Sequence, residues 1–197
     1  MNRLEAALRR AAGDLDKSTR PWALVGGFAV SARSEPRFTN DVDMAVMVDD
    51  DRAAEELVRS LVANGYALFS SVEHDNGRLA TARMAREFDG VDVVVDLLFA
   101  SSGIEAEVAQ AAELLEIAPG LPLPVATIGH LIALKVLARD DVTRPQDLAD
   151  LRALLAAASA EDLDLARQAV ALVEARGFNR GRDLGKALEE LTTQFKI

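Results

Sequence analysis

The sequence contains no cysteine, only two histidines and fewer basic than acidic residues. Its 197 residues include 22 lysines and arginines against 32 aspartates and glutamates, a formal net charge of −10 at pH 7. Without cysteine the chain has no disulfide, no thiol nucleophile and no cysteine-ligated metal centre. The acidic excess argues against non-specific binding to nucleic acid or anionic membranes, because such binding depends on attraction to phosphate. A local basic patch is still compatible with this charge.

Long apolar segments are also missing. The longest, residues 22–30, is interrupted by Gly26 and Gly27 and is too short to cross a bilayer. The first ten residues alternate charged residues with leucine and alanine, which is typical of an amphipathic helix and not of a secretory signal. We therefore expect a soluble, cytoplasmic protein without membrane contacts. Its length suits one compact domain or two small ones.

The periodicity of the apolar residues divides the chain into a mixed first part and a helical second part. In the first part it predicts strands at residues 22–25, 41–48, 66–72, 79–88 and 91–99. Helical spacing predicts a helix near the N-terminus and two more at residues 28–33 and 52–64. Between the last two strands, Asp89 and Gly90 predict a hairpin turn.

From residue 104 onward only helical periodicity is found. The predicted helices lie at residues 104–116, 127–139, 145–158, 160–176 and 183–195, with caps at Thr127, Ser159 and Gly177. Pro119, Pro122 and Pro124 predict a rigid connector between the first two of these helices. We accordingly expect a sheet domain at residues 1–118 and a helical domain at residues 119–197. The expected fold class is α/β (α+β): a mixed β-sheet flanked by helices and followed by a C-terminal helical bundle.

Three carboxylates are the most informative feature of the first part. Asp41 and Asp43 alternate on one predicted strand, so they point to the same side about 6.6 Å apart and can hold divalent cations between them. Asp96 follows the same alternation on a later strand, where Asp92 is a competing candidate. Converging carboxylates suit a two-metal phosphoryl-transfer site, because bound Mg²⁺ relieves their mutual repulsion. Taken alone, the pair of Asp41 and Asp43 is also typical of a solvated strand edge without a catalytic role.

A Gly-Gly turn precedes these carboxylates, with thirteen residues between Gly27 and Asp41. Gly26 and Gly27 lie between a strand and a short helix, an arrangement that lets a phosphate approach the backbone. A plain strand-to-helix turn is the alternative for any isolated glycine pair. The ordered combination of strand, glycine turn, helix and acidic strands favours a phosphate-binding enzyme.

These motifs together resemble those of a known superfamily. The stretches GGFAVSARSEPRFTNDVD, VVVDLLF, LIALKVLARDD and RPQDLADL look like those of the polymerase-beta-type nucleotidyltransferases, and within them the AbiEii-like toxins, including the mycobacterial MenT group. The resemblance covers most of the chain. It implies a nucleotidyltransferase toxin with a cognate antitoxin, which transfers a nucleoside monophosphate from a nucleoside triphosphate to an acceptor hydroxyl at the tRNA 3′ end. Two Mg²⁺ ions are the implied cofactors.

The resemblance assigns roles to individual residues. The implied metal ligands, which together with Lys135 form the catalytic set, are Asp41, Asp43 and Asp96. The implied nucleotide-binding residues are Gly26, Gly27, Arg37, Thr39, Lys135, Asp147 and Asp150. Many relatives have Gly-Ser at the glycine pair, so here backbone N–H groups replace a serine hydroxyl. Thr39 lies in a motif that some antitoxins phosphorylate, and a phosphate beside Asp41 would repel the incoming triphosphate.

The second half of the site leaves alternatives open. Lys135 is flanked by apolar residues, so it must extend to solvent, meet a carboxylate or meet a phosphate. Asp147 and Asp150 share a helix face, where they either act on the nucleotide or compensate the helix dipole; we favour action on the nucleotide for one of them, without choosing which. For His130 a hydrogen-bonded, partly buried side chain is favoured over a ligand.

Two other functions compete with the tRNA-modifying toxin. The acidic surface suits a polycationic aminoglycoside, which related small-molecule nucleotidyltransferases modify. An inactive nucleotide-binding module is disfavoured, because such a module does not need three converging acids. For an RNA acceptor we expect docking on the basic N-terminal helix and on a cluster formed by Arg176, Arg180, Arg182 and Lys186.

Overall fold

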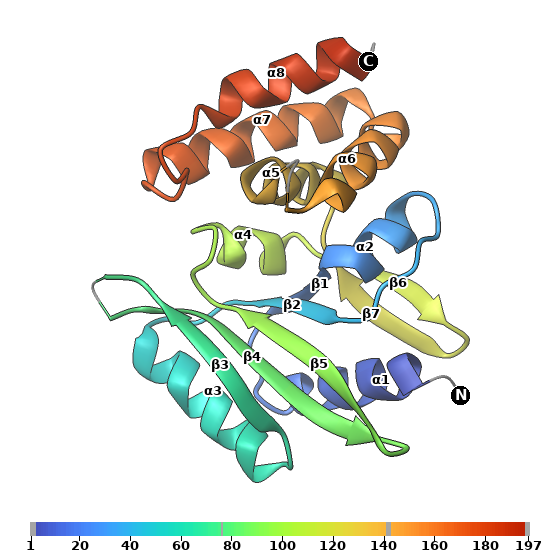
Figure 1. Cartoon of the computed structure of the whole chain (residues 1–197), viewed down its shortest axis with the longest axis vertical. Helices are drawn as coiled ribbons and strands as arrows, with labels where there is room; N and C mark the ends of the chain where they lie inside the picture. The colour runs from blue at the N-terminus through green and yellow to red at the C-terminus, as the bar shows by residue number, and fades with distance from the viewer. Residues whose placement is uncertain (1–2, 76, 141–142, 196–197) are drawn as a thin grey trace.

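A seven-stranded mixed sheet forms the centre of the computed structural model, which describes residues 3–75, 77–140 and 143–195 (Figure 1). The strands are β1 (Trp22–Val25), β2 (Val42–Val46), β3 (Ala67–Glu73), β4 (Leu79–Phe88), β5 (Val91–Leu98), β6 (Glu113–Ala118) and β7 (Leu121–Val125). Their order across the sheet is β3-β4-β5-β2-β1-β7-β6. Strand β2 is antiparallel to β1 and parallel to β5, so the predicted mixed sheet is confirmed.

Helices cover both faces of the sheet. On one face lie α1 (Arg3–Asp16) and α3 (Asp51–Ala63), and on the other lie α2 (Gly26–Arg33) and α4 (Glu105–Gln110) (Figure 1). Beyond α2 and α4 the chain forms the expected helical bundle of α5 (Ile128–Ala138), α6 (Pro145–Ala157), α7 (Ala160–Ala175) and α8 (Leu184–Phe195). Among the described residues, no helix has the length and apolar character needed to cross a membrane.

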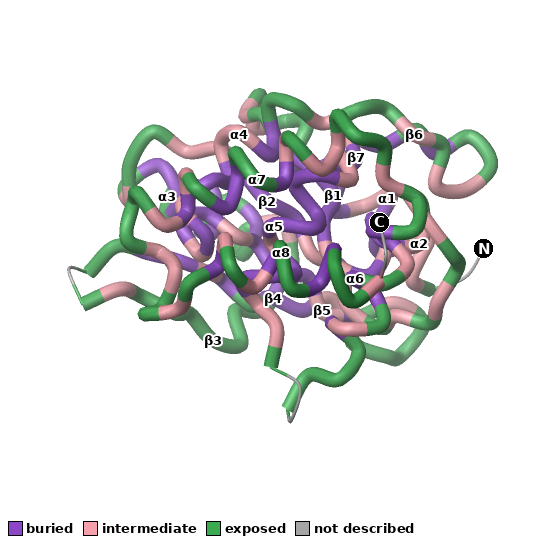
Figure 2. The backbone as a smooth tube through the Cα atoms, turned by 90° about the horizontal axis from the view of Figure 1, so that it is seen from above, coloured by how far each residue is buried: buried purple, intermediate pink, exposed green. Residues whose placement is uncertain are grey.

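The hydrophobic core runs from the sheet into the bundle. Val42 and Met44 alternate into it from β2, and Ile132 and Val136 enter it from α5, all of them fully buried. Figure 2 shows this continuity, with buried backbone at β1, β2 and α5 and exposed backbone along β3. Because one core serves both halves, the position of α5 relative to the strand ends is fixed by packing.

The predicted hairpin between β4 and β5 is confirmed. Asp89 and Gly90 both have positive φ angles, 52° and 76°, as a two-residue turn of the hairpin type requires. The turn sets the register of the two strands, and this register places Arg83 directly opposite Asp96. On its other side, Asp96 lies opposite Asp43 of β2. The three charged side chains therefore form a row across neighbouring strands.

The expectations for residues 104–125 are wrong in two respects. The helix predicted at residues 104–116 ends at Gln110, and β6 follows it. The proline-rich stretch is not a connector but the strand β7, which pairs with β6 and, through Leu24 and Val125, with β1. Pro122 and Pro124 alternate, so the N–H groups that they lack lie on one edge of the strand only. Leu121, Leu123 and Val125, which alternate with these prolines, are buried.

The remaining elements agree closely with the periodicity. Thr127 and Ser159 cap α5 and α7 through their side chains, and Ser159 forms a capping box with Asp162. Gly177 follows the C-cap of α7 with a φ angle of 78°. The division into two domains at residue 118 stays a prediction; that position now falls in the β6–β7 hairpin. The last residue of the quoted LIALKVLARDD stretch, Asp141, lies outside the described residues.

Candidate active site

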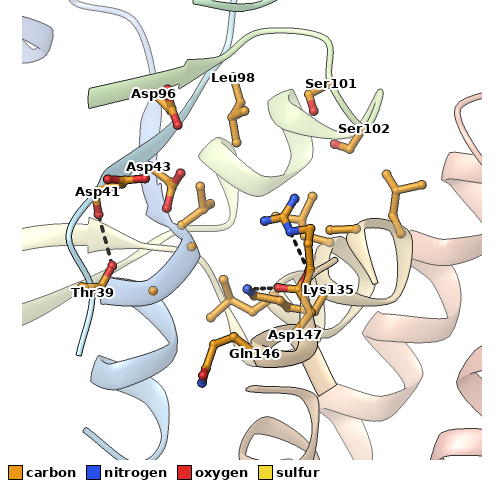
Figure 3. A pocket seen from close by; sticks show the side chains of 18 of the residues that line it. Thr39, Asp41, Asp43, Asp96, Leu98, Ser101, Ser102, Lys135, Gln146 and Asp147 are labelled. Atoms are coloured by element: carbon orange, nitrogen blue, oxygen red, sulfur yellow. Dashed lines mark hydrogen bonds and ion pairs between the residues drawn. The ribbon is translucent and has the colours of Figure 1, made fainter. Parts of the chain in front are cut away.

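A cavity of about 680 Å³ opens between the sheet and the helical bundle. Its lining includes the first residues of α2, the acidic residues of β2 and β5, and the side chains of α5 and α6. Figure 3 shows Asp41, Asp43 and Asp96 gathered on one side of this cavity and Lys135, Gln146 and Asp147 on the other. The volume is within the usual range for sites that bind small ligands.

The acidic side of the cavity consists of three carboxylates and one arginine, which we call the sheet-side cluster (Asp41, Asp43, Asp96 and Arg83). Arg83 donates from Nε and Nη2 to the two oxygens of Asp96 at 2.9 and 2.6 Å. The same Nη2 lies 3.7 Å from Oδ2 of Asp41. The cluster thus contains three acids and one base, so it retains an excess of negative charge.

Asp43 shows the electrostatic consequence of this excess. Burial raises its pKa to about 6, the negative charges of Asp96 and Asp41 add to the rise, and Lys135 and Arg144 oppose it. A carboxylate with a raised pKa is ionised at a cost in free energy. A bound cation would remove this cost, so the acidic side of the cavity favours a positively charged ligand.

Two consecutive glycines form the floor of the cavity. Gly26 has a φ angle of 62°, and a Cβ atom on it would lie 1.9 Å from Oδ2 of Asp43. A Cβ atom on Gly27 would lie 2.6 Å from Oγ1 of Thr39 and 2.8 Å from Nη2 of Arg37. Only glycine fits either position as the neighbours stand, and the N–H groups of the first helical turn remain accessible to a phosphate.

The opposite side of the cavity is formed by a group of paired charges, which we call the helix-side cluster (Lys135, Asp147, Asp150, Arg37 and Arg144). Lys135 Nζ lies 2.6 Å from Oδ1 of Asp147 and 2.8 Å from Oδ2 of Asp150. Arg37 pairs with Asp150 at 2.7 Å, and Arg144 pairs with Asp147 at 3.1 Å. Of the three alternatives for Lys135, the structure shows contact with carboxylates, and both aspartates provide it.

The segment before β2 connects the two clusters. Thr39 donates from Oγ1 to the backbone oxygen of Asp41 at 3.3 Å, and Arg37 donates from Nη1 to the backbone oxygen of Phe38 at 2.9 Å. Phe38 itself is 81 % exposed at the cavity. Because Arg37 also holds Asp150 of α6, this loop is tied to the helical bundle.

Some predicted residues are separated from the cavity. Asp92 is exposed on β5 opposite Glu87, four residues from Asp96, and is not among the lining residues. His130 is buried and bonded through Nδ1 to Thr127 Oγ1 at 2.9 Å, and burial lowers its pKa. This is the favoured interpretation of that histidine, a packed and hydrogen-bonded side chain.

Sequence reasoning missed Arg83 and Arg144. The signal for Arg83 was present, because a two-residue turn at Asp89 and Gly90 places residue 83 opposite residue 96 by simple counting. Arg144 precedes Pro145 at the start of α6 and is the first residue of the quoted RPQDLADL stretch, but it was assigned no role from the sequence. It reaches Asp147 through the helical spacing of three residues.

A mixed sheet that presents carboxylates on adjacent strands beside a glycine turn defines the class of the protein, a nucleotidyltransferase. The family model of the nucleotidyl transferase AbiEii toxin of type IV toxin–antitoxin systems matches residues 7–196. The chain therefore belongs to the AbiEii nucleotidyltransferase toxin family. The class uses a nucleoside triphosphate and a divalent metal ion, and a type IV system pairs the toxin with a cognate antitoxin.

Solved structures share the fold at low sequence identity. A solution structure of the antibiotic-resistance factor ANT(2″)-Ia is 19 % identical, covers 98 % of this chain and 100 % of its own, and has a TM-score of 0.54. A crystal structure of ANT(2″)-Ia with adenylyl-2″-tobramycin is 18 % identical, covers 87 % and 97 %, and has a TM-score of 0.56. The nucleotidyltransferase toxin MenT4 from Mycobacterium tuberculosis is 20 % identical over 76 % of this chain and 54 % of its own, with a TM-score of 0.47. A search of curated protein sequences gave no match.

The donor set of the sheet-side cluster fits a divalent cation. Carboxylate oxygens are the preferred ligands of Mg²⁺, and the pKa of Asp43 is raised by its burial and by the negative charges of Asp96 and Asp41. Within the described ranges, however, no group of three or more histidines, aspartates and glutamates already has the arrangement of a metal site. Both oxygens of Asp96 contact Arg83 instead.

Proposed function

We propose that this chain transfers a nucleoside monophosphate to a hydroxyl of an RNA acceptor, the tRNA 3′ end. The observation that carries the proposal is that Asp41, Asp43 and Asp96 face the same cavity as the glycine turn and the helix-side cluster. In the reaction the acceptor oxygen bonds to the α-phosphorus of the triphosphate. The bond from that phosphorus to the oxygen that bridges to the β-phosphate breaks, and pyrophosphate leaves with this oxygen.

We assign a different part of the reaction to each of the two clusters. Asp41, Asp43 and Asp96 are the residues that would hold two Mg²⁺ ions, which when bound neutralise the triphosphate and make the acceptor hydroxyl more acidic. We assign Asp96 to the acceptor side, where its charge favours loss of the hydroxyl proton. Arg37 and Lys135 lie across the cavity and stabilise negative charge on the phosphates.

A basic hollow beside the cavity supports a phosphate-bearing acceptor. It measures about 820 Å³ and shares Thr81, Ser101 and Arg180 with the cavity. Arg78 and Arg176 also line it, together with Asp75, and Arg176 is paired with Glu107 at 2.6 Å, so the arginines outnumber the acids around the hollow. In a chain of net charge −10, cations gathered next to the acidic site suit an RNA end. Helix α1 lies across the sheet from the cavity, so the RNA surface that we propose does not include this helix (Figure 1).

An aminoglycoside acceptor is the second candidate. The specific observations in its favour are the acidic net charge and the fold shared with ANT(2″)-Ia, whose complex contains an adenylylated tobramycin. A polycationic drug would approach the acidic side of the cavity without help from the basic hollow. The two candidates therefore differ in whether the arginines of the hollow contribute to binding.

One labelling experiment separates the candidates. The purified protein is incubated with each of four α-labelled nucleoside triphosphates and with total tRNA or an aminoglycoside mixture, and the labelled product is identified. We expect label on tRNA 3′ ends, loss of labelling in Asp41→Ala, and retention of it in Asp92→Asn. Label on the aminoglycoside supports the second candidate, and label that persists in Asp41→Ala contradicts the assignment of the site.

Thr39 offers a place for control by the antitoxin, which we propose acts by phosphorylating its hydroxyl. Thr39 Oγ1 lies against Gly27 at the start of α2, so a phosphate there would occupy the position of the triphosphate. Co-expression with the cognate antitoxin is expected to add the mass of one phosphate to the wild type and none to Thr39→Val. An unchanged wild-type mass counts against this regulation.

A further inference from the structure

Among the described residues, Arg83 is the only positively charged member of the sheet-side cluster. Its two contacts with Asp96 engage both carboxylate oxygens, in the bidentate geometry that makes arginine–carboxylate pairs strong. The Nη2 atom also faces Asp41, at 3.7 Å from Oδ2. One guanidinium nitrogen thus bridges two of the carboxylates that a bound cation would have to share.

The strand register explains why Asp96 turns toward Arg83. Asp96 lies between Asp43 on β2 and Arg83 on β4, so it has a like charge on one side and an opposite charge on the other. Directly opposed like charges destabilise a sheet, whereas opposite charges stabilise it. The side chain of Asp96 is only 10 % exposed, so water does little to compensate its charge. Pairing with Arg83 therefore stabilises the charge of Asp96 in the metal-free protein.

The same pairing opposes metal binding. A cation that ligates Asp96 must compete with two charge-assisted hydrogen bonds, and the nearby guanidinium repels it. Arg83 has room to withdraw, because its side chain is 48 % exposed and lines the cavity. Within the part of the chain that the structure describes, Arg83 pairs with Asp96 and Asp41, and no ion pair engages Asp43.

We propose that Arg83 is a positioning residue that occupies Asp96 and Asp41 in the metal-free protein and is displaced when a divalent cation binds. Arg83 thereby stabilises the empty site and sets the cation concentration at which Asp96 becomes available. The inference rests on the proposed metal-dependent function, because it assumes that the three carboxylates bind a cation.

Binding of Mn²⁺ to the full chain, without nucleotide or acceptor, tests the proposal. Free Mn²⁺ is measured by electron paramagnetic resonance, and the melting temperature is measured in EDTA and at saturating Mn²⁺. For Arg83→Gln we expect about tenfold tighter Mn²⁺ binding, a lower melting temperature in EDTA and a larger rise on adding Mn²⁺. Arg83→Lys keeps the charge but loses the two-pronged guanidinium contact, so its Mn²⁺ affinity should lie between those of the wild type and Arg83→Gln. This variant remains informative if Arg83→Gln does not fold.

Arg86→Gln is the matched control. Arg86 lies three residues further along β4, donates to the backbone oxygen of Asn64 and covers the ring of Tyr66 at 5.3 Å, away from the carboxylates. This variant should lose stability without any change in Mn²⁺ affinity. Unchanged or weaker Mn²⁺ binding in both Arg83 variants, with normal binding by the wild type, overturns the inference and leaves the proposed function standing. Absence of Mn²⁺ binding by the wild type overturns the metal site itself and this inference with it.

Discussion

The two sides of the cavity carry opposite charge balances. On the sheet side, Asp41, Asp43 and Asp96 face one cation among the described residues, Arg83, so that three acids meet one base. Burial raises the pKa of Asp43, and the charges of Asp96 and Asp41 raise it further. A site of this kind is unstable when empty and gains stability from a cation.

The helix side has the reverse balance. Asp147 and Asp150 are buried, but Lys135, Arg37 and Arg144 all contact them, so three cations meet two acids. The cluster is stable without a ligand and retains one positive charge. This half of the cavity suits the phosphates of a nucleotide, while the sheet side suits the metal ion that accompanies them.

The difference teaches that acidic residues that line the same cavity do not all have the same role. Asp147 and Asp150 both contact Lys135, which is buried in an apolar helix and needs such partners for its charge. On the sheet side, by contrast, the acids outnumber their partner. Substitutions that change one cluster and spare the other therefore test the comparison.

Substitution of Asp43 by asparagine should have the largest effect. We expect Asp43→Asn to lower nucleotidyl transfer by at least about 10³-fold, because a proposed metal ligand is lost. In EDTA the same variant should be more stable than the wild type by about 1–2 kcal/mol, because a carboxylate with a raised pKa is ionised unfavourably at neutral pH. Activity assays and urea unfolding measure the two effects.

Asp92→Asn is the control for this experiment, since Asp92 is exposed on β5 and does not line the cavity. It should change neither activity nor stability appreciably. A less stable Asp43→Asn would show that the charge of Asp43 is compensated in the metal-free protein, against the proposed imbalance.

Removal of Lys135 should affect stability most strongly. Lys135→Met leaves the carboxylates of Asp147 and Asp150 buried with fewer partners, and breaking a buried pair in this way costs about 3–5 kcal/mol. Adding Asp147→Asn to Lys135→Met should recover part of the loss, since one uncompensated charge is removed. Urea unfolding in EDTA measures both variants, with the exposed Lys186→Met as a control. A loss below about 1 kcal/mol would mean that solvent already screens the helix-side cluster.

The pH dependence of metal binding should be a property of the sheet side alone. A cation needs ionised Asp43, whose pKa is raised to about 6, so affinity should fall up to about tenfold per pH unit below pH 6. The stability of the metal-free protein should change in the opposite sense. Its folded state holds the proton of Asp43 more tightly than the unfolded chain, so this contribution is present below about pH 4 and is lost as the pH rises through 6.

Mn²⁺ titrations and urea unfolding between pH 4 and pH 7.5 check both trends. Asp43→Asn removes the titrating group and should flatten the stability profile in this window. A wild-type metal affinity that does not change between pH 5 and pH 7 would contradict the assignment of Asp43 as a ligand.

The sequence pattern predicted the sheet-side carboxylates more fully than the rest of the site. Period-two alternation gave Asp41, Asp43 and Asp96 a common direction, and the observed parallel pairing of β2 with β5 brings them together. Arg83 was predictable by counting across the hairpin. The partners of Lys135 were not, because its contacts cross from α5 to α6 and depend on how two helices pack.

Local pattern failed where two signals conflicted. In β7, the prolines at 122 and 124 outweighed the alternation of Leu121 and Leu123, although both signals were present. Residues 121–125 form a strand because pairing with β6 and β1 stabilises it, although its prolines give it a low strand propensity. The same tertiary context shortened α4, whose predicted second half pairs as β6.

The two adjacent glycines provide the finest test, because each touches a different cluster. A Cβ atom on Gly26 would strike Asp43, whereas one on Gly27 would strike Arg37 and Thr39. Gly26→Ala should therefore weaken Mn²⁺ binding, and its φ angle of 62° adds a further cost of roughly 1–2 kcal/mol in stability. Gly27→Ala should spare Mn²⁺ affinity and weaken nucleotide binding a few-fold, about 1 kcal/mol or less.

Gly27→Ala combined with Thr39→Ala checks the cause of the smaller effect. The alanine at position 39 removes Oγ1, the atom nearest to the new methyl group at 2.6 Å, while the contact with Cβ at 2.8 Å remains. Partial recovery of nucleotide affinity, with Mn²⁺ affinity still unchanged, would locate the disturbance on the helix side of the cavity. Equal loss of metal and nucleotide binding in Gly27→Ala would instead show that the glycine turn moves as one unit, so that the two clusters respond together.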